Sequence, residues 1–285
     1  MKITVGFSRI DEAGYFLENG ADEISCGMSE LPSFCDDQNV PDLDIQQAKR
    51  IADLAHSYGR KFFMYANAVR PDWQERIPFM RRLHEDAGVD GFIIASAEQA
   101  EIYPETENPP VWVIGILGFC FNSSAAEFYR SKGISRLIIP QHVLPEEGLK
   151  MCSIFSETEF YYITHEMDKN IDGLCLGCEV AKKEKRFCSR GFETSSGHVT
   201  FPMFSLDERL EYFYRYSRIA SFVKIVRFGS PQLRKLIFEE VKALKAISEK
   251  SSTLETFLIE AGRIIADVFL PRYRKLAAMH KNLII

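Results

Sequence analysis

Three of the chain's seven cysteines lie close together in the segment DGLCLGCEVAKKEKRFCSRG at residues 172–191. Cys175, Cys178 and Cys188 follow a C-x2-C-x9-C spacing, and the neighbouring lysines and arginines favour the thiolate form. Thiolates bind soft metals, so this segment could supply three ligands to tetrahedral zinc or to an iron–sulfur cluster. Two alternatives stay open, namely a C-x2-C redox pair and a solvated loop in which the cysteines have no joint role.

A fourth thiol for such a site would have to come from another part of the chain. Cys35 and Cys120 each follow a β-rich apolar segment, whereas Cys26 lies inside one and Cys152 lies on an expected helix. The latter two are typical of buried, small apolar side chains. Cys35 and Cys120 are therefore both candidates at this point.

Six other residues near expected strand ends could contact a substrate. A general acid or base could be supplied by His142 or Glu166. The expected substrate-binding residues, which offer amide groups or cationic groups suited to carboxylate or phosphate, are Asn67, Gln141, Lys224 and Arg227. For each of the six, a structural role in a turn, cap, exposed loop or ion pair is the alternative.

Peptidase chemistry has little support from the motifs. The chain has neither a G-x-S-x-G nucleophile elbow nor an H-E-x-x-H helix. Cys120 and His142, which follow neighbouring expected strands, could form a cysteine–histidine pair. A metal-dependent or cysteine-type hydrolase therefore remains an alternative.

Eight short β-rich apolar segments recur along the chain, and helical patterns occupy most of the gaps. The expected strands are residues 2–7, 22–27, 61–66, 90–95, 111–117, 135–140, 159–164 and 222–228. This alternation predicts an α/β fold of the TIM-type (β/α)8 class. An open doubly wound sheet is disfavoured, because eight strands make a long open sheet and no G-x-G-x-x-G follows the first strand.

The elements also predict how the chain is organised. Residues 42–59 form the clearest amphipathic helix, with Asp44 near its start and Gly59 at its C-terminal cap. Residues 1–231 are expected to form the barrel, which includes a long cysteine-bearing insert at 165–221. Residues 232–285 are expected to be helical and to pack on the barrel or on a partner, with a break or kink at Pro271.

Composition limits the classes of partner. The chain has 285 residues, 46% hydrophobic and 26% charged, with a net charge of −5. Such a chain has no overall attraction for RNA or anionic membranes. The sequence shows no apolar segment of membrane-spanning length and no leader, which predicts a cytoplasmic protein with reduced thiols. The odd number of cysteines then favours metal binding, catalysis or packing over disulfides.

Five segments are similar, in order, to those of the collagenase-like peptidase U-thirty-two family. They are ENGADEISCG at 18–27, AHSYGRKFFMYAN at 55–67, GVDGFIIA at 88–95, FNSSAAEFYRSKGISRLIIPQHVLPEE at 121–147 and VKIVRFGSP at 223–231. Each match alone is short, but the order of all five is fairly specific. The resemblance extends over about residues 1–245.

The resemblance implies a cluster and a ligand set. Members similar to the anaerobic ubiquinone-biosynthesis pair hold a 4Fe–4S cluster through four cysteines, one of which can come from the loop after the second strand. By this likeness the four ligands here are Cys35, Cys175, Cys178 and Cys188. Other members are implicated in oxygen-independent hydroxylation of RNA, and some are described as collagen-degrading proteases.

The chain also departs from the family pattern. Gln141 and His142 replace the Arg–Glu pair after the sixth strand, and Val226-Arg227-Phe228 replaces Glu-Gly-Arg after Lys224-Ile225. The cysteine spacing differs from the commonest one in the family. Substrate contacts are therefore expected to differ as well.

Three hypotheses follow. The first is a cluster-dependent enzyme for oxygen-independent hydroxylation or related redox modification of a small anionic or aromatic molecule, or of RNA. The second is a peptidase or other hydrolase, with zinc or with no metal. The third is a non-catalytic, cluster-bearing subunit of a hetero-oligomer that works only with a partner. A homo- or hetero-dimer with a related barrel is the expected form of assembly.

Overall fold

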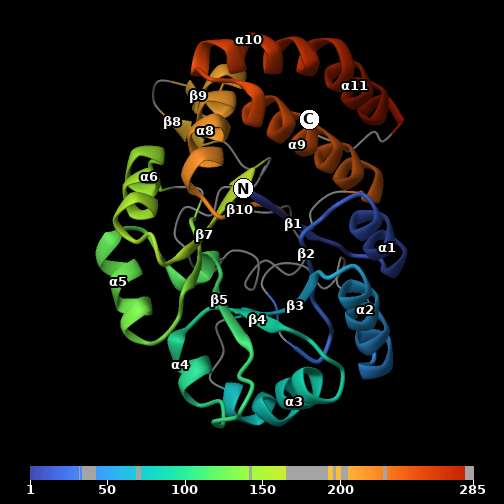
Figure 1. Cartoon of the computed structure of the whole chain (residues 1–285), viewed down its shortest axis with the longest axis vertical. Coiled ribbons are helices and arrows are strands. Elements are labelled where there is room, and N and C mark those ends of the chain that lie inside the picture. Colours follow the sequence, from blue (N-terminus) through green and yellow to red (C-terminus); the bar gives the residue numbers. More distant parts are fainter. Residues whose placement is uncertain are drawn as a thin grey trace.

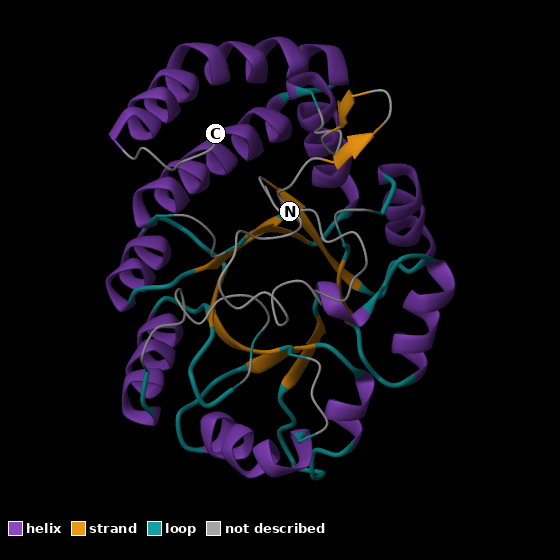
Figure 2. Cartoon of the chain, turned by 180° about the vertical axis from the view of Figure 1, so that it is seen from behind, coloured by secondary structure: helices purple, strands orange, loops and turns teal. Residues whose placement is uncertain are grey.

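The computed structural model shows a closed ring of parallel strands surrounded by helices (Figure 1, Figure 2). It describes residues 1–31, 33, 43–68, 72–140, 143–164, 192–194, 197–199, 205–226 and 230–279. The barrel strands are β1 (Lys2–Gly6), β2 (Glu23–Cys26), β3 (Lys61–Ala66), β4 (Gly91–Ile94), β5 (Val111–Ile114), β6 (Arg136–Ile138), β7 (Glu159–Thr164) and β10 (Phe222–Ile225). Their order is β1-β10-β7-β6-β5-β4-β3-β2, which confirms the predicted TIM-type barrel.

Helices connect successive strands on the outside of the barrel (Figure 2). They are α1 (Ile10–Glu18), α2 (Ile45–Ser57), α3 (Trp73–Glu85), α4 (Ala97–Glu101), α5 (Ser123–Ser131), α6 (Pro145–Ile154) and α8 (Leu206–Ile219). Helix α2 is shorter than the expected range 42–59, but an Asp and a Gly mark its two ends as the sequence predicts. The Asp44 carboxylate accepts a hydrogen bond from the backbone N–H of Gln47 at 2.7 Å, and Gly59 adopts a φ of +65° just beyond the last turn.

The barrel has two layers of core, because alternate residues of each strand point inward and outward. Outward side chains pack against the helices, while the apolar side chains inside the barrel are Phe63, Tyr65, Ile93, Val113, Ile138, Tyr161, Ile163 and Phe222. At Gly91 a methyl group would overlap the backbone carbonyl of Val111. Glycine therefore allows β4 and β5 to approach closely.

The strand expected at 111–117 is shorter in the structure. After β5, the chain forms a 3₁₀ turn, η1 (Ile116–Gly118), which ends at Phe119 in the left-handed region with φ of 57°. Two further strands, β8 (Phe192–Thr194) and β9 (Gly197–Val199), pair antiparallel between β7 and β10. These two strands are too short to show a regular alternation of apolar residues in the sequence.

The C-terminal part is helical, as predicted, and packs against the barrel helices (Figure 1). It comprises α9 (Pro231–Lys250), α10 (Leu254–Ile264), a π-helical turn (Ile265–Phe269) and α11 (Leu270–Met279). Pro271 lies inside α11, so the helix continues through it. The wider π-helical turn directly precedes the position where proline lacks its N–H.

Buried polar contacts attach α11 to the other helices. The carboxylate of Glu240, on α9, is fully buried and accepts a hydrogen bond from the hydroxyl of Tyr273 at 2.6 Å. It also lies 3.3 Å from the guanidinium of Arg209, on α8. Within the described part of the chain, no helix is both long and apolar enough to cross a membrane.

Candidate functional site

Two of the ten predicted site residues lie in the described part of the chain. Asn67 follows β3 and Lys224 lies on β10, and their exposed fractions are only 6% and 3%. The other eight lie outside the described residues, and they are Cys35, Gln141, His142, Glu166, Cys175, Cys178, Cys188 and Arg227. The roles assigned to all ten stay predictions.

The parallel strands place the starting points of the predicted cysteine segments at one end of the barrel. Strand β2 ends at Cys26 and β7 ends at Thr164. Every barrel pair is parallel, so both strands end at the C-terminal rim. This rim carries the functional residues in barrels of this class.

Three cysteines in the described residues belong to the core. Cys26, Cys120 and Cys152 are all buried, as the sequence predicted for Cys26 and Cys152. Burial raises the pKa values of Cys120 and Cys152 to about 12. A buried neutral thiol is a poor nucleophile, which argues against Cys120 as the cysteine of a hydrolase.

Lys224 points into the barrel and reaches toward β2 and β3. Its ammonium lies 3.5 Å from the hydroxyl oxygen of Ser25 and 5.2 Å from the ring centroid of Tyr65. The Ser25 hydroxyl in turn donates to the Tyr65 hydroxyl at 3.3 Å. These residues come from three strands whose alternation turns each of them inward. Together they form a buried cation with two hydroxyl groups beside it.

A second polar cluster, which the sequence analysis missed, lies closer to the N-terminal end of the barrel. The guanidinium of Arg136 donates to the carboxylate of Glu23 at 2.8 Å and to the hydroxyl of Tyr161 at 3.1 Å. The Tyr161 hydroxyl donates to the other Glu23 oxygen at 3.0 Å. Burial raises the pKa of Glu23, and the opposing effect of the Arg136 charge does not fully offset it.

Aromatic rings enclose this cluster. Arg136 lies 5.6 Å from the ring centroid of Phe63 and 5.4 Å from that of Phe222, and Tyr161 stacks on Phe222 at 4.4 Å. The sequence signal was available in ADEISCG, where Glu23 and Ser25 alternate with apolar residues. In a parallel strand that is buried on both faces, such alternation marks a polar inner wall.

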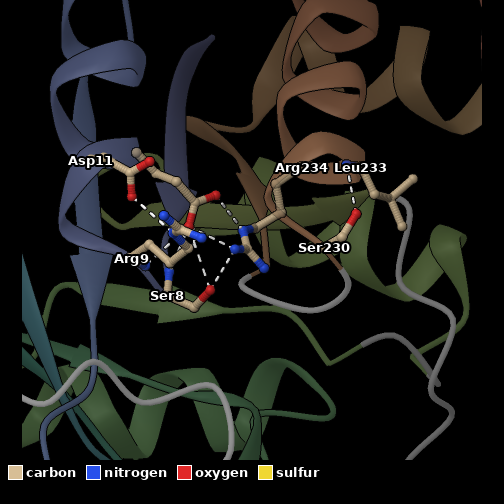
Figure 3. A network of polar contacts seen from close by, with 7 residues as sticks. Ser8, Arg9, Asp11, Ser230, Leu233 and Arg234 are labelled. Atoms are coloured by element: carbon tan, nitrogen blue, oxygen red, sulfur yellow. Dashed lines mark hydrogen bonds and ion pairs between the residues drawn. The ribbon is translucent and has the colours of Figure 1, made fainter. Parts of the chain in front are cut away.

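At the C-terminal rim, a fully buried ion pair joins the starts of α1 and α9. The guanidinium of Arg234 donates to both oxygens of the Glu12 carboxylate, at 2.9 and 2.6 Å, and also donates to the hydroxyl of Ser8 (Figure 3). Glu12 also accepts from the backbone N–H of Arg9 at 3.0 Å. Ser230 caps α9 through the N–H of Leu233 at 3.2 Å (Figure 3). This network fixes the β1–α1 loop against the first turn of α9.

The fold and its buried polar groups define a (β/α)8 barrel protein with a charged inner wall. The model of Peptidase family U32 matches residues 8–176, which is more than half of the chain. The chain therefore belongs to Peptidase family U32.

Solved structures agree with this fold. The U32 peptidase Mk0906 is 14% identical with a TM-score of 0.55, and the match covers 81% of this chain and 94% of that one. N-acetylneuraminate lyase from Mycoplasma synoviae is 8% identical with a TM-score of 0.53, over 93% of this chain and 80% of that one. At these identities the likeness concerns the fold alone. Among proteins with curated functions, no sequence matches the chain significantly.

Proposed function

We propose that this member of Peptidase family U32 binds a 4Fe–4S cluster and carries out oxygen-independent hydroxylation or a related redox modification of a small molecule or RNA. The proposed ligands are Cys35, Cys175, Cys178 and Cys188. A cluster bound by these thiolates would supply one-electron transfer. The barrel's own residues would bind and orient the substrate at the C-terminal rim.

The locations of the seven cysteines in the chain and the fold are the main support for the proposal. Cys26, Cys120 and Cys152 are buried in the core, and the two whose pKa values are raised are unsuited to metal binding. The remaining four match in number the thiolates that a 4Fe–4S cluster requires. They also lie in two segments that follow β2 and β7, which end at the same rim.

The lengths of the two segments are compatible with a shared site. Strands β2 and β7 are separated by β1 and β10, which corresponds to about 14 Å along the barrel wall. Cys35 follows Cys26 by nine residues, and Cys175 follows Thr164 by eleven. Nine extended residues span about 30 Å, so the chain is long enough for the thiols to meet.

Metal analysis of anaerobically purified protein tests this proposal. We expect a broad absorbance band near about 400 nm, with about four irons and four sulfides per chain. Alanine substitution of Cys35, Cys175, Cys178 or Cys188 should each lower the iron content, whereas Cys152→Ala should not. One zinc per chain would instead support a zinc-dependent hydrolase, and protein without metal would contradict both the cluster and a zinc site.

A further inference from the structure

The inner wall of the barrel is divided into a polar part and an apolar part. On β10, β1 and β2 the inward residues toward the C-terminal end include Lys224, Thr4, Gly6 and Ser25. The wall formed by β4 to β7 instead presents the aliphatic side chains Ile93, Val113, Ile138 and Ile163. Tyr65, on β3, lies between the two parts.

Among the described residues, the ammonium group of Lys224 has few partners for so buried a charge. It is 3% exposed and carries three N–H donors, but its hydrogen bond to Ser25 is long, at 3.5 Å. No carboxylate in the described part of the chain lies within ion-pair distance of it. The Glu23 carboxylate, which is held by Arg136 and Tyr161, is close enough for the Lys224 charge to lower its pKa but forms no ion pair with it. Burial of a charge without close compensation lowers stability unless a ligand or function requires it.

The strand register shows the direction in which the ammonium points. On the backbone, Lys224 is paired with Thr4, and Thr4 is paired with Glu23. The ammonium nevertheless contacts Ser25, which is two residues further along β2 and pairs with Gly6. Gly6 has no side chain to separate them. The cation is therefore directed toward the C-terminal rim, from which substrates enter such barrels.

We propose that Lys224, with Ser25 beside it, is the anchor for the carboxylate of a small organic acid whose apolar body packs against the aliphatic wall. A charge-assisted hydrogen bond from the ammonium would hold the carboxylate. Tyr65 and Ile163 would contact the apolar body. This inference names a substrate class for the proposed enzyme and rests on that function, but it requires no cluster for binding.

Benzoate is a suitable probe, because it combines one carboxylate with an apolar ring, and benzamide is its uncharged analogue. Titration calorimetry on anaerobically purified protein should show saturable benzoate binding and at least about tenfold weaker benzamide binding. Lys224→Met should weaken benzoate binding by at least about tenfold, and Ser25→Ala by a few-fold. Lys61→Met is the matched control, because Lys61 is exposed at the N-terminal end of β3.

The variant should fold, since methionine has a similar length and replaces a buried, poorly paired charge. We expect the melting temperature of Lys224→Met to equal or exceed that of the wild type. Benzoate affinity that is unchanged in Lys224→Met, or equally reduced in Lys61→Met, would overturn the inference. So would the lack of saturable binding by the wild type up to about 20 mM benzoate.

Iron content, measured on the same samples, separates this inference from the proposed function. Protein that binds benzoate through Lys224 but holds no iron would support the proposed acid-binding site and contradict the proposed cluster. Protein that holds four irons but does not bind benzoate would support the cluster and contradict the acid-binding site.

Discussion

At the scale of single residues, the interior of the barrel holds charges where most barrels of this class hold branched apolar side chains. Glu23, Arg136 and Lys224 all lie inside the ring of strands and are nearly inaccessible to solvent. Arg136 contacts Glu23 directly, whereas Lys224 contacts a serine hydroxyl and an aromatic ring. The first arrangement is a satisfied structural cluster, whereas the second leaves N–H donors of Lys224 unused by the described residues.

The raised pKa of Glu23 predicts a specific pH dependence of stability. Because burial raises this pKa above its ordinary value of 4.5, the folded protein binds the proton more tightly than the unfolded chain does. The resulting stabilisation is present below pH 4.5 and is lost as the pH rises through the folded-state pKa. Urea unfolding from pH 4 to pH 7 should therefore show a decline that Glu23→Gln lacks, with a slope of at most about 1.4 kcal/mol per pH unit. Parallel curves for the two proteins would contradict this assignment.

The buried cysteines should resist alkylation. With pKa values raised to about 12, Cys120 and Cys152 are thiolates in roughly one molecule in ten thousand at pH 8. Peptide mass spectrometry after iodoacetamide treatment should find both residues unmodified in the native protein and fully modified in guanidinium. Native labelling of Cys120 at the rate of a free thiol would show that it is accessible and reopen a nucleophilic role.

At the scale of elements, the contact between α6 and α8 depends on one glycine. Gly148 lies where the hydroxyl of Tyr216 approaches α6, and that hydroxyl donates to the carbonyl of Pro145 at 3.4 Å. Tyr216 cannot move aside easily, because its ring stacks on Tyr162 of β7 at 4.3 Å. The glycine therefore sets how closely the two helices approach each other.

Alanine at two glycines should have opposite effects. A methyl at position 148 would overlap the Tyr216 hydroxyl, so Gly148→Ala should lower the free energy of unfolding by about 1–3 kcal/mol. Gly14, within α1, has open space around its Cα, and Gly14→Ala should raise the free energy of unfolding by about 0.5–1 kcal/mol. Denaturant unfolding measures both, and equal effects would contradict the packing described for Tyr216.

The elements were the part of the structure best predicted from sequence. All eight barrel strands were located, because apolar runs such as KFFMYA are short, β-branched or aromatic, and separated by helical patterns. Strand ends were less well predicted, as at residues 111–117, where a 3₁₀ turn continues an apolar run. Local pattern does not distinguish a strand from a turn that is equally buried.

The site was predicted less completely. Lys224 and Asn67 were selected from their positions at strand ends, and both are buried on the inner side. Glu23 and Arg136 were not selected, since their contact joins residues 113 apart in sequence. Such pairings depend on barrel closure, which no single segment encodes.

At the scale of the whole molecule, the C-terminal helices extend the hydrophobic core beyond the barrel. Phe257 and Phe269 are buried, and α10 packs on α8 while α11 packs on α9. The fully buried carboxylate of Glu240 accepts a hydrogen bond from the hydroxyl of Tyr273 of α11 at 2.6 Å. Attachment of the last helix thus adds a hydrogen bond to a buried carboxylate that also lies 3.3 Å from the guanidinium of Arg209.

Removal of the Tyr273 hydroxyl should show how much this hydrogen bond to Glu240 contributes to stability. Tyr273→Phe leaves a buried carboxylate short of a donor, so the free energy of unfolding should fall by about 1–3 kcal/mol. Tyr58→Phe is the control, because that side chain is 43% exposed, and it should change stability by less than about 0.5 kcal/mol. Thermal unfolding compares the two, and a Tyr273→Phe protein as stable as the control would show that α11 contributes little to the fold.

The ion pair between Glu12 and Arg234 has a consequence for anion binding at this corner of the rim. Many (β/α)8 barrels bind a phosphate group near the last strands, at a helix N-terminus. Here the Arg234 guanidinium, in the first turn of the helix that follows the last strand, holds the Glu12 carboxylate of the chain itself, which also accepts from the backbone N–H of Arg9 at the start of α1. A phosphorylated metabolite would have to displace a competitor that is covalently attached and therefore present at very high effective concentration. The protein thus supplies its own counter-ion for Arg234, and a phosphate group could pair with this guanidinium only by displacing Glu12.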